Sequence, residues 1–310
     1  MVVEDQFVFQ SSDGVRHPVR RWSGSQLIPG RGTLICLHGI QSHSGWYRWS
    51  STQLARAGWS VNFPDRRGSG RSQERRGDAP SAERLLADVV ELAREIQEVD
   101  APCVLLGLSW GARLAAILAA RHPEIFQRLV LLYPGIHTQV RPNFWQRQGL
   151  RIATRVGAGL RTVSIPLADP SLFTGDPDGQ EFIRNDTLAL HELTLRFLAA
   201  SEILAAEADR VAEEISVPTL VFLAEKDRIV DNEGARAWYH RLPVIHKELI
   251  IVPGAEHTFD FDPKREWFIE RLIGWLNHFS TDAASAPVTA LGPDSPAVAK
   301  PVLRDGDVDS

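Results

Sequence analysis

The stretch PCVLLGLSWGARLAAILAARH, residues 102–122, joins an apolar run to a helical pattern through GLSWG, a Gly-x-Ser-x-Gly sequence. An apolar strand that turns sharply into a helix at this sequence is typical of a nucleophile elbow, which exposes its central serine above a sheet. The start of the helix would also place N–H groups and a positive dipole end beside Ser109. Because Gly-x-Ser-x-Gly is common by chance, Ser109 is a candidate nucleophile only if the rest of the chain supplies a fitting fold and partners.

Short apolar runs alternate with helical patterns on both sides of this stretch. After an N-terminal hairpin, strands are expected at 33–39, 59–65, 102–108, 128–135, 218–227 and 247–254. Helices are expected at 46–57, 82–99, 110–122, 232–240 and 264–278. Strands that are this apolar, separated by helices, indicate a mostly parallel sheet with helices on both faces. The sequence therefore predicts an α/β fold.

Two segments fall outside the alternation. Residues 138–210 contain no clear strand but include a long apolar helical run at 187–204, and they interrupt the series of sheet strands. We interpret 138–210 as a helical cap inserted into a core formed by residues 1–137 and 211–279. Residues 280–310 are rich in Ala, Pro, Ser and Asp and lack aromatic side chains, which predicts a disordered tail.

Composition narrows the class of protein further. The net charge of −5 gives no reason to expect nucleic acid as a partner, and no apolar run approaches the ~20 residues of a membrane span. The acidic start MVVEDQFVFQ does not resemble a signal peptide. Cys36 and Cys103 lie in apolar runs without CxxC spacing, which favours buried free thiols over a disulfide or a metal site. We therefore expect a cytoplasmic protein without a metal ion.

A serine nucleophile requires a base, and the base requires an acid that orients it. Asp227 closes the strand 218–227, and His257 lies in the loop after the strand 247–254. Both would then meet Ser109 at the carboxyl edge of the sheet, where open α/β sheets bind ligands. These positions predict a triad of Ser109, Asp227 and His257. Glu225 and Asp231 remain alternative acids.

A serine that attacks a carbonyl group also needs two N–H groups directed at the developing oxyanion of the tetrahedral intermediate. One is expected from Trp110, directly after the nucleophile. The other is expected from the turn after the strand 33–39, where His38 and Gly39 fit a tight turn, and we assign it to Ile40. His38 itself is interpreted as a structural residue whose hydrogen bond holds this turn.

Four further segments carry a family resemblance. LHGIQSHSGWYRW at 37–49 resembles the HGxxEHSxRY segment of the monoacylglycerol lipase and lysophospholipase branch of α/β-hydrolases. FPDRRGSGRS at 63–72 resembles the D-x-x-GHGxS loop of that branch, and 220–231 and 252–259 resemble its acid and base segments. The resemblance covers 33–135 and 218–278. It implies an α/β-hydrolase fold and a cofactor-free serine esterase acting on a small ester, such as an acylglycerol or a lysophospholipid. It also implies the triad and the two oxyanion donors given above.

The chain also departs from that branch. DRRGSGRS and the Trp of GLSWG resemble proline iminopeptidases, but those enzymes carry HGGPG where this chain has HGIQS at 38–42. The acidic residue that the branch has before His-Ser is Ser42 here. An aminopeptidase, a thioesterase or an acyltransferase would share the first half-reaction, and a non-catalytic binding protein on the same scaffold is the alternative from another class.

The predicted cap contains the candidates for substrate contact. Phe144, Trp145 and Phe173 are candidates for lining an acyl pocket, and packing of the cap onto the core is the alternative explanation. Arginines recur every four residues at 147, 151 and 155, which places them on one stripe of a helix. Such a stripe fits an anionic group or peripheral contact with an anionic membrane, and a solvated helix face is the simpler alternative.

Overall fold

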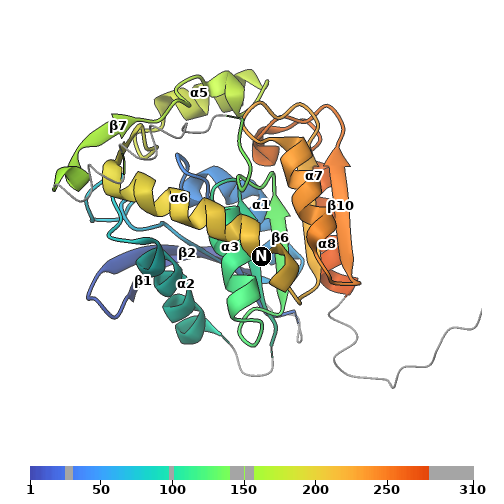
Figure 1. Cartoon of the computed structure of the whole chain (residues 1–310). Helices are drawn as coiled ribbons and strands as arrows, with labels where there is room; N and C mark the ends of the chain where they lie inside the picture. The colour runs from blue at the N-terminus through green and yellow to red at the C-terminus, as the bar shows by residue number, and fades with distance from the viewer. Residues whose placement is uncertain (25–30, 98–100, 140–149, 151–156, 279–310) are drawn as a thin grey trace, which may run out of the picture.

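A sheet of eight strands runs through the centre of the molecule (Figure 1). The computed structural model describes residues 1–24, 31–97, 101–139, 150 and 157–278. In spatial order the strands are β1 (Val2–Gln10), β2 (Arg16–Gly24), β4 (Ser60–Pro64), β3 (Thr33–Leu37), β5 (Cys103–Leu108), β6 (Arg128–Leu132), β9 (Thr219–Ala224) and β10 (Lys247–Val252). The hairpin β1–β2 pairs antiparallel with β4, and the six strands from β4 to β10 are parallel. The predicted mostly parallel sheet is confirmed.

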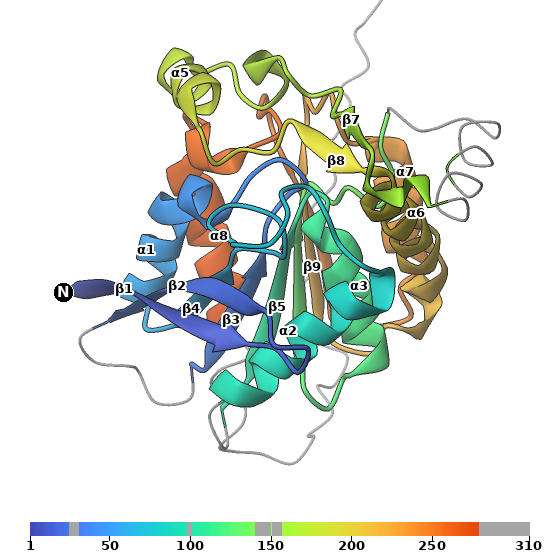
Figure 2. The same ribbon diagram turned by 90° about the vertical axis from the view of Figure 1, so that its left-hand side faces the viewer.

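Helices cover both faces of the sheet, as Figure 2 shows. On one face lie α1 (Arg48–Arg56) and α8 (Arg265–His278), and on the other lie α2 (Ala82–Ile96), α3 (Gly111–Arg121) and α7 (Asn232–Arg241). Every residue of β3, β5, β6 and β9 is buried between these layers. A strand covered on both faces is almost entirely apolar, which is why these strands could be predicted from near-continuous apolar runs in the sequence.

The segment that was predicted as a helical cap with no clear strand contains two short strands. These are β7 (Thr162–Ser164) and β8 (Glu192–Thr194), which pair antiparallel. The other described elements here are η2 (Ala158–Leu160), η3 (Pro170–Leu172), α5 (Pro177–Asn185) and α6 (Leu195–Arg210). The strands were missed because each has only three residues and all three residues of β7 are exposed, too little to produce an alternating pattern.

The long helix of this segment begins later than expected. A helix was predicted from residue 187, but α6 begins at Leu195 because residues 192–194 pair with β7. The hydroxyl of Thr194 then accepts a hydrogen bond from the Phe197 N–H at 3.1 Å, which caps the helix. Residues 157–194 lie above the carboxyl ends of the parallel strands (Figure 1). The division at 138 and 210 stays a prediction, and residues 280–310 lie outside the described part of the chain.

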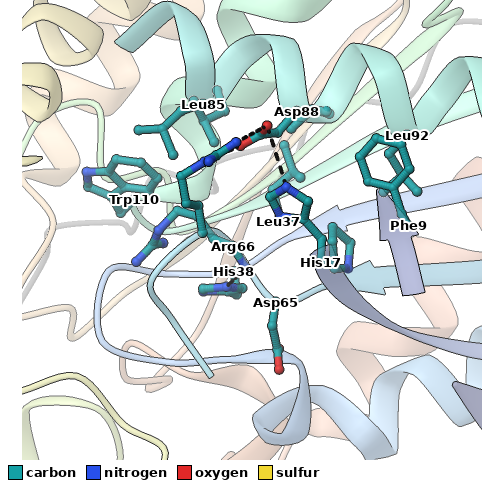
Figure 3. Close-up of a pocket in the computed structure, with 14 residues that line it drawn as sticks. Phe9, His17, Leu37, His38, Asp65, Arg66, Leu85, Asp88, Leu92 and Trp110 are labelled. Carbon is teal, nitrogen blue, oxygen red and sulfur yellow. Dashed lines mark hydrogen bonds and ion pairs between the residues drawn. The ribbon is translucent and has the colours of Figure 1, made fainter. Parts of the chain in front are cut away.

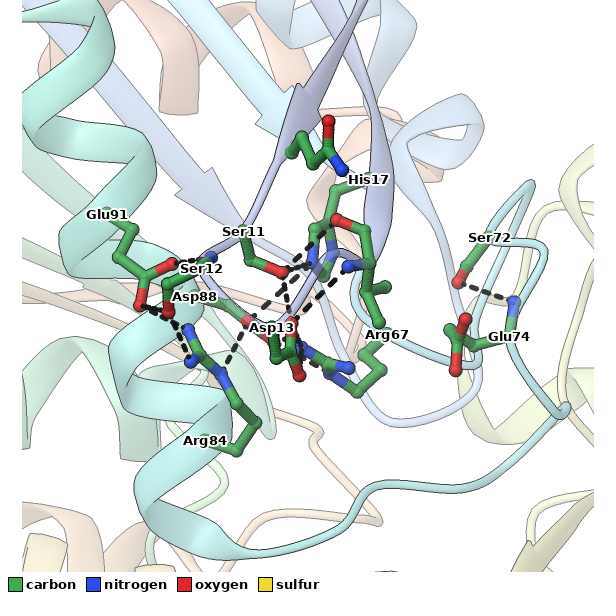
Figure 4. A network of polar contacts seen from close by, with 12 residues as sticks. Ser11, Ser12, Asp13, His17, Arg67, Ser72, Glu74, Arg84, Asp88 and Glu91 are labelled. Carbon is green, nitrogen blue, oxygen red and sulfur yellow. Dashed lines mark hydrogen bonds and ion pairs between the residues drawn. The ribbon is translucent and has the colours of Figure 1, made fainter.

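The N-terminal hairpin is tied to α2 through a network of charged side chains (Figure 4). Arg67, which is 4% exposed, donates hydrogen bonds to Asp88 of α2 at 2.8 and 3.0 Å and to Asp13 of the hairpin turn at 3.2 Å. Glu91 of α2 accepts hydrogen bonds from the backbone and the hydroxyl of Ser12. Since Arg67 belongs to the loop after β4, the network also fixes that loop against the core.

Close packing at the start of α3 yields a first prediction. A Cβ on Gly111 would lie 2.0 Å from the carbonyl oxygen of Leu37, and that backbone, part of β3, cannot move without disturbing the sheet. Gly111→Ala is therefore expected to lower the free energy of unfolding by about 3 kcal/mol, measured by urea denaturation. The matched control is Gly274→Ala in α8, where a Cβ meets nothing within 4 Å. It should raise the free energy by about 0.5–1 kcal/mol. Equal stabilities for the two variants would contradict the packing described here.

Candidate functional site

Ser109 occupies a strained turn between β5 and α3. Its φ of 50° lies in the left-handed region, a conformation that costs a residue other than glycine about 1–3 kcal/mol. The surrounding backbone holds it there: the Ser109 N–H donates to the Leu132 carbonyl at 3.0 Å, and the Ser109 carbonyl accepts from the Gly135 N–H at 2.8 Å. A Cβ on Gly107 would lie 2.7 Å from Ala112, so the turn closes only with glycine there. This is the backbone form of a nucleophile elbow.

The structure brings the three predicted triad residues together. The Ser109 Oγ lies 2.9 Å from His257 Nε2, and His257 Nδ1 lies 2.8 Å from Asp227 Oδ2. They are 9%, 3% and 7% exposed respectively. With Nδ1 donating to the carboxylate, Nε2 is left as the acceptor that a serine hydroxyl needs in order to lose its proton. The arrangement can therefore activate a hydroxyl nucleophile.

Asp227 is held in place through its other oxygen. Asp227 Oδ1 accepts hydrogen bonds from the N–H groups of Ile229 and Val230, both at 2.8 Å. The two alternative acids are engaged elsewhere. Glu225 accepts from the Gly254 N–H at 2.7 Å, and Asp231 accepts from the Gly234 N–H at the start of α7.

The two predicted oxyanion donors belong to segments that adjoin the nucleophile. A Cβ on Gly39 would lie 3.8 Å from the Ser109 Oγ, so the turn after β3 passes directly beside the hydroxyl. Neither the Ile40 nor the Trp110 N–H donates a hydrogen bond to another group within the described part of the chain. Both donors are thus available for a ligand oxygen.

His38 holds the turn after β3, as its structural interpretation requires. Its Nδ1 lies 2.8 Å from the Gly39 carbonyl oxygen, and its Nε2 accepts from the Arg66 N–H at 3.0 Å. Burial lowers the pKa of His38 well below its usual range, so the ring is neutral at physiological pH. A neutral ring with Nδ1 protonated satisfies both hydrogen bonds.

Aromatic side chains form one wall beside the candidate base. The ring of Phe173 lies 5.9 Å from that of His257 and 5.4 Å from that of Trp46, measured between centroids. Trp46 in turn contacts Phe182 and Phe261 at 6.3 and 5.9 Å. Of the predicted pocket residues, Phe173 therefore lies at the site. Phe144 and Trp145 lie outside the described residues, as do the arginines at 147, 151 and 155.

A carboxylate that was not predicted from the sequence lies beside this aromatic wall. Asp186, which follows α5, accepts hydrogen bonds from Trp46 Nε1 at 2.6 Å and from His43 Nε2 at 3.0 Å. Burial opposes the ionisation of Asp186, but these two hydrogen bonds hold its pKa below the ordinary value. No local pattern around residue 186 marks it, because its partners lie more than a hundred positions earlier.

Asp260, three residues after His257, yields a prediction about stability and pH. It is 3% exposed, and its Oδ1 accepts from the Ser50 N–H at 3.0 Å. Burial raises its pKa from the ordinary 3.8 to about 6. The folded state therefore binds this proton more tightly than the unfolded chain, so the stabilisation is complete below pH 3.8 and is lost as the pH rises through about 6. The expected loss is about 3 kcal/mol.

The comparison with Asp260→Asn isolates this group from other carboxylates. Between pH 3.5 and pH 7.5, the wild type should lose about 3 kcal/mol of unfolding free energy relative to the variant. Urea denaturation at several pH values gives both curves. A difference between the two proteins that stays constant across this range would contradict the buried position of Asp260.

Three observations bear on other kinds of site. Within the described residues, no group of three or more His, Cys, Asp or Glu side chains is placed to hold a metal ion. None of the helices in the described part of the chain is long and apolar enough to cross a membrane. Cys36 and Cys103 are both buried and free, as the sequence predicts.

Comparison with known proteins finds one family and several relatives. The family model described as "Serine aminopeptidase, S33" matches residues 29–264. A monoacylglycerol lipase from Mycolicibacterium smegmatis is 25% identical over 79% of this chain and 88% of the relative. The phospholipase YtpA from Bacillus subtilis is 26% identical over 75% of this chain and 90% of the relative. The crystal structure of Paleococcus ferrophilus monoacylglycerol lipase superposes with a TM-score of 0.74 at 25% identity, covering 88% of this chain and 98% of that one.

Proposed function

Because the chain belongs to the serine aminopeptidase S33 family of α/β-hydrolases, in its monoglyceride lipase-like branch, and is a carboxylic ester hydrolase, we propose that it cleaves acylglycerol- or lysophospholipid-like esters through an acyl-enzyme on Ser109. The observation that carries this proposal is the pair of hydrogen bonds from Ser109 through His257 to Asp227, at 2.9 and 2.8 Å. The strained φ of Ser109 supports it, because strain of this kind persists where a function requires it.

In the acylation half-reaction, the Ser109 Oγ attacks the ester carbonyl while His257 Nε2 accepts its proton. The carbonyl oxygen becomes an oxyanion, which the N–H groups of Ile40 and Trp110 stabilise. Asp227 orients the imidazole and stabilises the positive charge that it acquires. When the tetrahedral intermediate collapses, the alcohol leaves with the proton from His257, and the acyl group remains on Ser109.

In the deacylation half-reaction, water takes the place of the alcohol. His257 removes a proton from the water, which attacks the acyl carbonyl, and the same two N–H groups stabilise the second oxyanion. The proton then returns from His257 to the Ser109 Oγ, and the carboxylic acid departs. No step of this proposed mechanism requires a metal or an organic cofactor.

The substrate class is argued from the surroundings of the base and from the relatives. The apolar wall of Trp46 and Phe173 beside His257 suits an acyl chain or another apolar group better than a charged one. Two relatives are named for monoacylglycerol and phospholipid cleavage. We also propose that residues 138–210 act as the cap that selects the substrate, with Phe173 contributing to its lining.

A second candidate function is hydrolysis of N-terminal proline peptides, which the aminopeptidase description of the family favours. HGIQS at 38–42 lacks the two glycines and the proline expected of such enzymes, so we place it second. A thioesterase and an acyltransferase would use the same acyl-enzyme, whereas a non-catalytic binding protein would form none.

Substrate profiling distinguishes these functions. p-Nitrophenyl esters from acetate to palmitate, a monoacylglycerol, a lysophospholipid and proline p-nitroanilide would each be assayed with wild type and with Ser109→Ala. We expect Ser109-dependent cleavage of esters, with the preferred acyl length reporting the depth of the pocket. Cleavage of the proline amide alone would establish the aminopeptidase instead. Failure to cleave any substrate or to react with a fluorophosphonate would favour a binding role.

A further inference from the structure

Arg66 contacts both segments that carry the proposed oxyanion donors. It follows β4 in the sequence DRRGSGRS. Its Nη1 donates to the Gly39 carbonyl and its Nη2 to the Ile40 carbonyl, each at 3.0 Å. Its Cζ lies 4.6 Å from the centroid of the Trp110 ring. Figure 3 shows the side chain directed at Trp110, with His38 close by.

The contact with Gly39 determines the direction of an N–H group. The Gly39 carbonyl and the Ile40 N–H belong to one peptide unit, which is planar and trans, so the two groups point in opposite directions. Arg66 Nη1 and His38 Nδ1 both approach this carbonyl oxygen, at 3.0 and 2.8 Å. With the carbonyl held from this side, the Ile40 N–H must point away from Arg66. A cation on the carbonyl also polarises the peptide, which makes its N–H a stronger donor.

The contact with Trp110 restrains the second donor. The guanidinium of Arg66 lies over the indole ring, and the ring of Phe197 from α6 stacks against the same indole at 5.3 Å. The indole N–H donates to the Ser201 hydroxyl at 2.8 Å. The Trp110 side chain is therefore fixed by neighbours on several sides, which restrains its backbone N–H beside Ser109.

The charge of Arg66 is not neutralised by a direct ion pair. Within the described residues, no carboxylate lies close enough to form a salt bridge with its guanidinium; the carboxylate of the adjacent Asp65 instead accepts hydrogen bonds from the N–H groups of Ser44 and Arg71. Burial lowers the pKa of Arg66 to about 9, so it remains charged at neutral pH. A partly buried cation that, within the described residues, donates to carbonyls and lies over aromatic rings acts electrostatically on the groups around it.

We propose that Arg66 is a positioning residue for the oxyanion hole, which aligns and polarises the Gly39–Ile40 peptide and clamps the Trp110 side chain. The inference rests on the proposed acyl-enzyme mechanism. It assigns to one side chain the task of holding donors from two separate loops at a fixed spacing, and catalytic donors need such support from outside the reacting shell. The effect of Arg66 is therefore expected on the stability of the transition state and not on substrate binding, because the bound ester carries no oxyanion.

The first test compares Arg66→Met with a matched arginine. Arg128 also donates to a backbone carbonyl, that of Leu276, and lies over the Trp59 ring, but it is at the opposite end of the sheet at the start of β6. We expect Arg66→Met to lower kcat on a p-nitrophenyl ester roughly 10- to 100-fold, with KM changed less than about threefold. Arg128→Met should lower the Tm but leave kcat within about twofold.

A transition-state analogue distinguishes misalignment of the oxyanion donors from a general loss of structure in the variant. A boronic acid forms a tetrahedral adduct on the serine and occupies the oxyanion hole, whereas a carboxylic acid product binds without that adduct. Arg66→Met should lower the affinity for the boronic acid by the same factor by which kcat falls. It should leave the affinity for the carboxylic acid product within about threefold. Arg66→Lys, which keeps the charge but replaces the rigid planar fork of donors by a single ammonium, should give an intermediate kcat and serves as the second variant if the methionine variant does not fold.

Chemical rescue gives the sharpest readout. Arg66 and Trp110 both line the cavity of Figure 3, so truncation to Arg66→Ala opens space beside the indole. Methylguanidinium at millimolar concentration should restore kcat at least tenfold, and methylammonium should not. Wild-type kcat in Arg66→Met, or equal losses in Arg66→Met and Arg128→Met, would overturn the inference. Activity that survives Ser109→Ala would overturn the proposed function instead, so the two failures are distinguishable.

Discussion

Replacing Ser109 by alanine is expected to lower kcat for ester hydrolysis by about 10⁶-fold, the scale reached when a serine nucleophile is removed from an intact triad. The reason is geometric, because the Ser109 Oγ is the atom that lies 2.9 Å from His257 Nε2. A water molecule in its place could not form the covalent acyl-enzyme. The Tm should change by only a few degrees, because the backbone hydrogen bonds that hold the turn are unaffected.

Pre-steady-state kinetics tests the same variant at the level of mechanism. With a p-nitrophenyl ester, wild type should release about one equivalent of p-nitrophenol per molecule in an initial burst whenever deacylation is the slower step. Ser109→Ala should show no burst. Ser42→Ala is the matched control, because Ser42 lies in the turn beside the site but hydrogen-bonds to the Tyr47 hydroxyl at 2.8 Å rather than to a base. It should keep kcat within about tenfold. Substantial turnover by Ser109→Ala would mean that the base activates water directly.

The second large effect is expected at Asp227. Asp227→Asn should lower kcat by about 10⁴-fold, since an amide favours the wrong tautomer of His257 and supplies no negative charge to the imidazolium. The loss should appear in kcat with little change in KM, because Asp227 is buried behind the base and contacts His257 rather than the substrate.

Two neighbouring carboxylates provide the controls for Asp227→Asn. Glu225→Gln and Asp231→Asn should each leave kcat within about threefold, because these side chains accept hydrogen bonds from Gly254 and Gly234. Asparagine at 231 still caps α7, so its stability should be nearly unchanged. A larger loss in either control than in Asp227→Asn would show that the orienting acid has been misassigned.

Much of the candidate site could be predicted because the same topological rule places each of its candidate catalytic groups. Each candidate catalytic group follows a parallel strand: Ser109 follows β5, Asp227 follows β9 and His257 follows β10. Parallel strands present their carboxyl ends at one edge, so three residues far apart in the sequence converge without any knowledge of side-chain contacts. The strands themselves could be predicted from the sequence because burial on both faces requires nearly continuous apolar runs.

The remaining features could not be predicted because they depend on contacts between distant polar groups. Arg66 lies in a loop rich in arginine and glycine, where nothing local separates it from Arg67, which instead bonds to Asp88. Asp186 follows α5 and meets Trp46 only when the chain folds back. The hairpin of β7 and β8 was missed for a different reason, since strands of three residues are too short to show a period.

Mass spectrometry of the fluorophosphonate-treated protein tests the central claim most directly. The claim is that one activated serine, Ser109, forms the acyl-enzyme. We predict a single phosphonyl adduct per molecule, mapped to the peptide that contains Ser109, with adduct formation and loss of esterase activity following the same time course. Esterase activity that persists without an adduct, or is lost through an adduct on another residue, would contradict the assignment of Ser109.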